Sequence, residues 1–215
     1  MAESNRARRL KEETQTSDWK SDLFDWLQLL VLVLVLVVSL FTFVVSVVGV
    51  DGSSMYPTLQ NRDMMLVRRI AYEPQAGDVI VLRKDGSFQD RALVKRIIAT
   101  GGQTVFINYN TNTITVDGEV VDEPYLNYEY DSEYQDDYLA LRYDLDSQYV
   151  NREFTVPEGY VFVCGDNRNH SSDSRDSRLG TVDVRYVIGK AVFLAFPGPD
   201  QYNGERSYGR IGAIK

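Results

Sequence analysis

The chain has 215 residues, enough for one domain of ordinary size with additional segments. Its formal net charge is −8, and no basic cluster follows its N-terminal region, so we expect no binding to nucleic acid. It carries a single cysteine and a single histidine, which exclude an internal disulfide and suggest neither a metal ion nor a cofactor.

The first distinctive segment is an uncharged run of 25 residues from Trp26 to Val50. As a helix it would span roughly 37 Å, more than the ~30 Å hydrocarbon core of a bilayer requires. It lacks the polar face of a core helix and is too long for a cleavable signal peptide. We therefore expect a transmembrane signal anchor over residues 26–47, with the β-branched residues near Val47–Val50 already in a strand.

Charges on the two sides of this run predict its orientation. Residues 1–25 contain five Lys or Arg, whereas three follow within 20 residues after the run: Arg62, Arg68 and Arg69. The positive-inside rule then makes residues 1–25 a cytoplasmic tail and puts residues 48–215 outside the cytoplasm. The chain would be a single-pass protein of the cell membrane, with lipid as one partner.

Segments of alternating or β-branched residues follow the anchor, separated by turn signals such as Gly101-Gly102 and Asp117-Gly118. We expect a mostly β domain in which strands pair across long connections. The predicted strands are Met64–Arg68, Val79–Arg83, Ala92–Ala99, Thr104–Ile107, Thr113–Val116, Tyr160–Val163 and Gly189–Phe196.

Residues 117–146 differ from the rest in composition. They hold eleven Asp or Glu against one basic residue, Arg142, and six tyrosines are interleaved among them. Such a stretch is usually a solvated face, but the tyrosines argue against full disorder. We predict an inserted, acidic and Tyr-rich subdomain over residues 104–159.

Three segments carry chemically suggestive residues. The small residues of Gly52-Ser53-Ser54 favour a sharp turn with an exposed hydroxyl. Lys95 lies in a predicted strand among aliphatic residues, where a lysine usually extends toward water. If buried there, its pKa would fall below the usual ~10.4, and the neutral amine would accept a proton from a serine.

The third segment is the polar stretch Gly165–Arg175, rich in Asp, Asn, Ser and Arg. By itself it is also compatible with a surface turn that carries ion pairs. Cys164 ends the apolar run before it, so we interpret the thiol as a small buried hydrophobe.

In this order behind an anchor, the segments resemble the bacterial type I signal peptidase family in its single-anchor, Gram-positive-like form. The matching stretches are Ser54-Met-Tyr-Pro-Thr-Leu59, Gly77-Asp-Val-Ile-Val81, Lys95-Arg96-Ile-Ile-Ala-Thr-Gly-Gly102, Gly165-Asp-Asn-Arg168 and Asp173-Ser-Arg175. The resemblance covers nearly the whole chain from the anchor to Arg210-Ile-Gly212.

The resemblance implies a coiled antiparallel β-sheet catalytic domain with an inserted β-rich subdomain, behind one transmembrane helix. Ser54 would be the nucleophile, Lys95 the general base and Ser171 the hydroxyl that orients Lys95. Some family members carry a serine at the position where this chain, like other single-anchor members, has Gly52, so the backbone N–H of Ser54 would be the main oxyanion donor. The remaining implied residues form a structural network of Arg96, Asp166, Asp173 and Arg175, and substrate pockets of Val48, Val50, Met55, Leu59, Leu93 and Val94.

The implied activity is a serine endopeptidase that removes signal peptides from exported preproteins after a small-x-small motif. The resemblance implies no cofactor and no metal, and we expect a functional monomer.

Three alternatives remain beside this interpretation. His170 lies next to Ser171 and near Asp173, so a Ser–His–Asp arrangement is one, although triad partners rarely come from a single loop. A non-enzymatic surface protein that binds through its acidic segment is the second. An autoprocessing serine–lysine protease is the third, and the anchor and the lack of a DNA-binding region argue against it.

Overall fold

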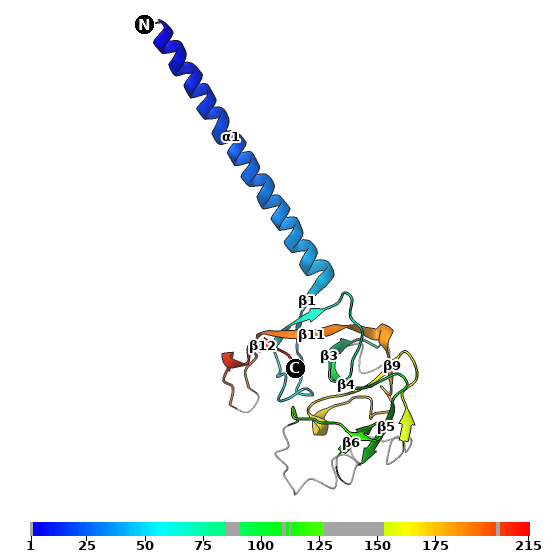
Figure 1. Cartoon of the computed structure of the whole chain (residues 1–215). Coiled ribbons are helices and arrows are strands. Elements are labelled where there is room, and N and C mark those ends of the chain that lie inside the picture. Colours follow the sequence, from blue (N-terminus) through cyan, green and yellow to red (C-terminus); the bar gives the residue numbers. More distant parts are fainter. Residues whose placement is uncertain (1, 85–90, 109–110, 112, 127–152, 201–202) are drawn as a thin grey trace. The chain divides into compact units, whose positions relative to one another are not determined.

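The computed structural model describes residues 2–84, 91–108, 111, 113–126, 153–200 and 203–215 (Figure 1). The chain divides into two compact units, residues 1–44 and residues 45–215.

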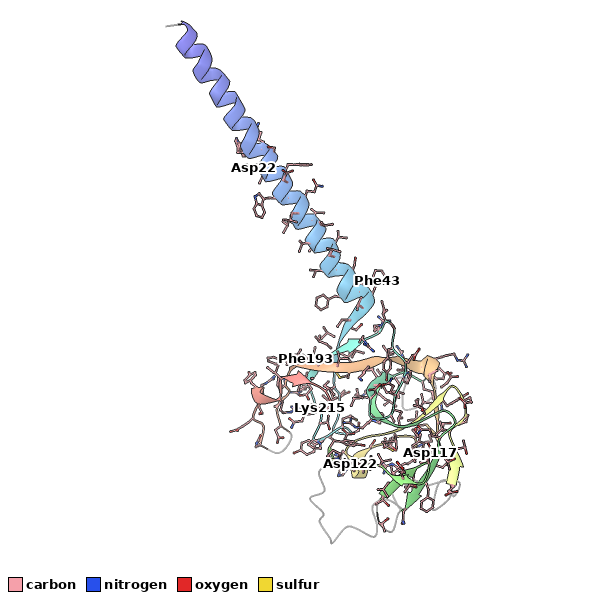
Figure 2. All side chains as sticks on the ribbon, viewed as in Figure 1. Asp22, Phe43, Asp117, Asp122, Phe193 and Lys215 are labelled. Carbon is pink, nitrogen blue, oxygen red and sulfur yellow. The ribbon has the colours of Figure 1, made fainter. Side chains whose placement is uncertain are left out.

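The first unit is helical. Helix α1 spans Ala2–Ser39 and continues into a π-helix over Leu40–Val44. From Leu29 to Val38 the helix consists of Leu and Val alone, and these side chains are all exposed (Figure 2). The segment Trp19–Val44 is long and apolar enough to cross a membrane. A helix with apolar residues on every side is stable where lipid surrounds it.

The second unit begins with strand β1, Val45–Gly49. This start lies two residues before the strand start expected near Val47, and inside the span predicted over 26–47. The physical reason is pairing, since Val45 is already aligned with Arg68 of β2 in an antiparallel ladder.

The larger sheet of this unit is antiparallel and curled, in the order β1-β2-β11-β3-β4-β9-β10, with β12 pairing β11. Register shifts interrupt β11 and the β4–β9 ladder, and such bulges increase the local bend of a sheet. Its strands after β1 are β2 Met64–Arg68, β3 Val79–Leu82, β4 Leu93–Thr100, β9 Tyr160–Cys164, β10 Val182–Asp183, β11 Val187–Phe196 and β12 Gly212–Ala213.

A smaller sheet is inserted in the chain between β4 and β9. Its order is β7-β6-β5-β8, all antiparallel, and it lies on the side of the domain opposite β1 (Figure 1). The strands are β5 Thr104–Asn108, β6 Thr113–Val116, β7 Glu119–Val120 and β8 Glu153–Thr155. It falls inside the predicted insertion 104–159, but most of the acidic stretch, residues 127–152, lies outside the described residues.

Three short 3-10 helices complete the described elements: Arg168–His170, Val184–Tyr186 and Tyr208–Arg210. The described residues of the domain form three hydrophobic clusters. One joins β1, β2 and β11 with the loop that follows β1, and the second lies under the smaller sheet. The third packs against β3, β4 and β9.

The predicted fold class is confirmed. Each of the seven predicted strands is present with its ends shifted by at most a few residues, and the domain is mostly β behind an apolar helix. The strands that the pattern did not predict are short: β7, β10 and β12 have two residues each and β8 has three. A segment of that length cannot display a period of two, so its pairing depends on tertiary contacts.

Candidate active site

Ser54 lies in a loop between β1 and β2, which we call the serine loop (residues 50–63). The loop is closed at its base, where the N–H of Val50 donates to the carbonyl of Asp63 at 2.8 Å. Gly52 has a φ of +100°, a conformation that a glycine adopts without strain. Two buried side chains flanking the turn, Met55 and Leu59, anchor the loop, while Ser54 stays partly exposed. The sequence thus builds a turn that presents a serine hydroxyl.

Lys95 reaches Ser54 from β4. Its Nζ lies 2.8 Å from Oγ of Ser54 and 2.9 Å from the carbonyl oxygen of Val94. The lysine is only 2% exposed. Burial lowers its pKa to about 8, although the nearby Asp173 carboxylate opposes the shift. The amine is therefore neutral in a substantial fraction of molecules near pH 8.

The stretch Gly165–Arg175, which we call the polar loop, holds the backbone on either side of the Ser54 hydroxyl. The N–H of Asn167 donates to the carbonyl of Ser54 at 3.0 Å, and its side-chain amide donates to the carbonyl of Ser53 at 3.1 Å. Packing here is so close that a Cβ on Gly165 would lie 2.4 Å from the carbonyl oxygen of Ser54. Sequence reasoning did not single out Asn167, because its role depends on a contact with a loop more than a hundred residues earlier.

Ser171 is 2% exposed and lies beside Gly165. Its hydroxyl faces the Asp173 carboxylate and helps to lower the pKa of that group, and no hydrogen bond joins it to Lys95 among the described residues. The Nζ of Lys95 is instead bonded to Ser54 and to the carbonyl of Val94. Ser171 is thus buried at the edge of the site without the expected bond to Lys95.

The predicted network residues form two buried ion pairs beside Lys95. Arg96 donates through Nε and Nη2 to Asp166, at 2.9 and 2.6 Å, and both side chains are almost fully buried. The hydroxyl of Thr58 donates to the same carboxylate at 2.5 Å. Asp166 therefore connects the serine loop to Arg96 of β4. Sequence reasoning missed Thr58, although a hydroxyl four residues after Ser54 in a matching motif was an available signal.

The second pair is Asp173 with Arg175, at 2.8 Å between Nε and Oδ1. The same carboxylate accepts the N–H of Gly165 at 2.9 Å, so the pair closes the polar loop on itself. Burial would raise the pKa of Asp173, but the Arg175 guanidinium outweighs it and holds that pKa below its usual range.

Five of the six predicted pocket residues belong to one apolar cluster around the serine loop: Val48, Val50, Met55, Leu59 and Val94. Leu93 does not join them. It packs into the cluster of β3, β4 and β9, because neighbouring residues of a strand point to opposite faces. The structure therefore separates Leu93 from the other five.

Cys164 and His170 were the other candidates for chemistry. Cys164 is fully buried, and burial raises the pKa of its thiol to about 12, so the thiol stays neutral. His170 is exposed in the 3-10 helix Arg168–His170. Within the described part of the chain, no group of three His, Cys, Asp or Glu residues is arranged to hold a metal ion.

The chain is similar to known peptidases. A family model described as signal peptidase, peptidase S26, matches residues 23–196. The chain is 33% identical over 188 residues to a signal peptidase I of Bacillus licheniformis, covering 86% of this chain and 95% of that protein. It is 34% identical over 181 residues to signal peptidase I S of Bacillus subtilis, covering 83% and 91%. A solved signal peptidase I from Enterococcus faecalis is 28% identical with a TM-score of 0.38, covering 55% of this chain and 97% of that one.

Proposed function

This chain belongs to the signal peptidase family, peptidase S26, and we propose that it cleaves preproteins with Ser54 as nucleophile and Lys95 as general base. Its function is that of a type I signal peptidase, a serine endopeptidase that processes signal peptides. The observation that carries the assignment of residues is the 2.8 Å distance between Nζ of the buried Lys95 and Oγ of the partly exposed Ser54.

The proposed reaction has two steps. Neutral Lys95 takes the proton of Ser54 as Oγ attacks the substrate carbonyl carbon. The C–N bond then breaks, the lysine ammonium gives its proton to the leaving amine, and an ester joins the signal peptide to Ser54. In the second step Lys95 takes a proton from water, and the resulting hydroxide attacks the ester carbonyl carbon. The bond between that carbon and Oγ then breaks, the lysine ammonium returns its proton to Oγ of Ser54, and the signal peptide leaves as a carboxylate.

The oxyanion formed in each step needs a hydrogen-bond donor. Gly52 supplies no side chain, and within the described residues the N–H of Ser54 donates to no other group. We assign that N–H as the main donor. A missing side-chain donor costs about 2.7–4 kcal/mol of transition-state stabilisation, which a second donor must offset.

The substrate is proposed to bind as an added strand. Within the described chain β1 pairs with β2 alone, and Leu93–Lys95 of β4 pair with β3 but not with β9. An extended peptide that pairs with these free edges would direct alternate side chains toward the cluster of Val50, Met55 and Val94. These side chains are at most 9% exposed, so little room remains beside them.

We expect a strong preference for small residues at the first and third positions before the cut. Changing either alanine to leucine in a preprotein should lower kcat/KM by roughly a hundredfold, since overfilling a packed site typically costs 1–3 kcal/mol or more. Cleavage rates of matched preproteins test this, with an alanine-to-leucine change at the second position as the control. Equal rates for all of these substrates would contradict the proposed pockets.

The burial of Lys95 predicts a pH dependence. Protonated lysine has no lone pair for the proton of Ser54, so kcat/KM should rise with pH through about 8 and level off above it. The measurement is kcat/KM from pH 6 to 10 for the wild type and for His170→Ala. An acid limb near 6.5 that disappears in His170→Ala would assign the base to histidine instead.

The apolar helix is proposed to anchor the enzyme in the cell membrane as a single span, with residues 1–25 in the cytoplasm and the catalytic domain outside it. Support comes from the apolar span Trp19–Val44, which is uncharged from Trp26 onward, and from the surplus of Lys and Arg on its N-terminal side. Membrane lipid would then be a partner beside exported preproteins, and we propose that one copy of the chain suffices for cleavage.

A further inference from the structure

Residues 121–126, which we call the strap, leave the smaller sheet and cross to the catalytic machinery. The strap is held at its start, where the N–H of Val121 donates to the carbonyl of Ile114 in β6 at 2.9 Å. It turns at its end, where the N–H of Leu126 donates to the carbonyl of Glu123 at 3.1 Å. It belongs to the acidic, Tyr-rich part of the chain, for which composition predicts a solvated face.

Glu123 is not solvated. Its carboxylate forms an ion pair with Arg168 of the polar loop, and each side chain is 8% exposed. The guanidinium reaches both carboxylate oxygens, with Nη1 3.1 Å from Oε2 and Nη2 bonded to Oε1. The hydroxyl of Tyr125 donates to Oε1 as well, at 2.7 Å. A buried pair with this many hydrogen bonds is held in one geometry.

The Arg168 side chain connects the ion pair with Glu123 to the backbone around Ser54. Its Nε donates to the carbonyl of Gly165 at 3.1 Å, which fixes the start of the polar loop. The preceding residue, Asn167, donates its N–H to the carbonyl of Ser54. Two residues therefore link Glu123 to the backbone of the nucleophile.

Tyr125 makes a second contact, on the side of the base. Its ring lies 3.8 Å from the guanidinium carbon of Arg96, a cation–π distance. Arg96 follows Lys95 in β4 and holds Asp166, which in turn accepts the hydroxyl of Thr58 in the serine loop. The strap thus contacts Arg168, in the polar loop that bonds to Ser54, and Arg96, next to Lys95 in β4.

We propose that Glu123 and Tyr125 are positioning residues for peptide cleavage, which hold the polar loop and the Lys95 strand at the distance that the serine–lysine pair requires. The inference rests on the proposed function, because it concerns that same pair. Neither residue touches the reacting atoms. Their loss should lower kcat and leave KM nearly unchanged, because the apolar pocket cluster does not include them.

The test compares Glu123→Ala and Tyr125→Leu with the conservative variants Glu123→Asp and Tyr125→Phe in the full chain in detergent. Misplacing reacting groups by about 1 Å lowers a rate by up to about a hundredfold. We therefore expect kcat for a preprotein to fall between about tenfold and a hundredfold in the first two, with KM within about twofold. Tyr125→Phe keeps the ring over Arg96, and Glu123→Asp keeps the charge, so each should recover part of the rate. Asp122→Ala, an exposed acidic neighbour, is the matched control and should keep the wild-type rate.

Hydrogen exchange of the peptide that covers the polar loop supplies a readout independent of cleavage. Exchange should be faster in Glu123→Ala than in the wild type or Asp122→Ala. The proposal would be overturned if Glu123→Ala and Tyr125→Leu fold and keep the wild-type kcat. A rise in KM with unchanged kcat would overturn it as well. If Glu123→Ala does not fold, the kcat of Glu123→Gln and Tyr125→Leu decides in the same way. One result would separate the two proposals. If Ser54→Ala keeps the wild-type cleavage rate while exchange of the polar loop is still faster in Glu123→Ala, the proposed catalytic role of Ser54 is wrong, but the structural role of the strap is supported.

Discussion

Replacing Ser54 with alanine, or Lys95 with methionine, is expected to abolish preprotein cleavage, with kcat lowered by at least about a thousandfold. The nucleophile and the base act on one proton, so losing either disables the pair. Methionine keeps the length and the apolar stem of the buried lysine and removes only its amine. The kcat values of the purified full chain, with thermal unfolding of each variant, measure the effect.

His170→Ala is the matched control, because His170 is the chain's only histidine and is exposed. It should cleave at the wild-type rate. An inactive His170→Ala variant beside an active Lys95→Met variant would show that the serine is activated by histidine.

Replacing Asp166 with alanine is expected to destabilise the domain by about 3–5 kcal/mol, because the Arg96 guanidinium would stay buried without its carboxylate. The exposed pair between Arg91 and Asp51 offers a matched comparison within the same domain. Its side chains are 68% and 81% exposed, so Asp51→Ala should cost only about 0–1 kcal/mol.

The measurement for this comparison is the free energy of unfolding in urea, taken from the same detergent-solubilised chain. Equal losses for Asp166→Ala and Asp51→Ala would contradict the account of the buried network. A large loss for Asp166→Ala accompanied by unchanged kcat in the folded fraction would limit Asp166 to a role in stability.

The longer strands and the apolar helix were predictable because their patterns are local. Residues Leu29–Val38 contain no polar residue that could form the solvated face of a buried helix. In β4, aliphatic and β-branched residues lie on both sides of the pair Lys95-Arg96. The two catalytic candidates were found through the motifs around Ser54 and Lys95. The 2.8 Å contact between them is a property of the folded sheet.

The residues that sequence reasoning missed act through distant contacts. Thr58 reaches Asp166 across 108 positions of the chain, and Glu123 reaches Arg168 across 45. Composition suggests solvation for an acidic stretch because most carboxylates stay in water, and it cannot identify a carboxylate, such as that of Glu123, that pairs with a buried arginine. Leu93 lies apart from the other five pocket candidates for a related reason, since the two faces of β4 pack against different clusters.

The central claim is that Lys95 is a neutral base at the working pH of the enzyme, and titration of its side chain tests it most directly. The ¹³Cε resonance of Lys95 in lysine-labelled protein, assigned by its absence in Lys95→Met, should titrate with a pKa of about 8. The acid limb of the kcat/KM profile should have the same midpoint. A Lys95 amine that stays protonated up to its ordinary pKa near ~10.4, while cleavage already proceeds fully at pH 8, would contradict the account.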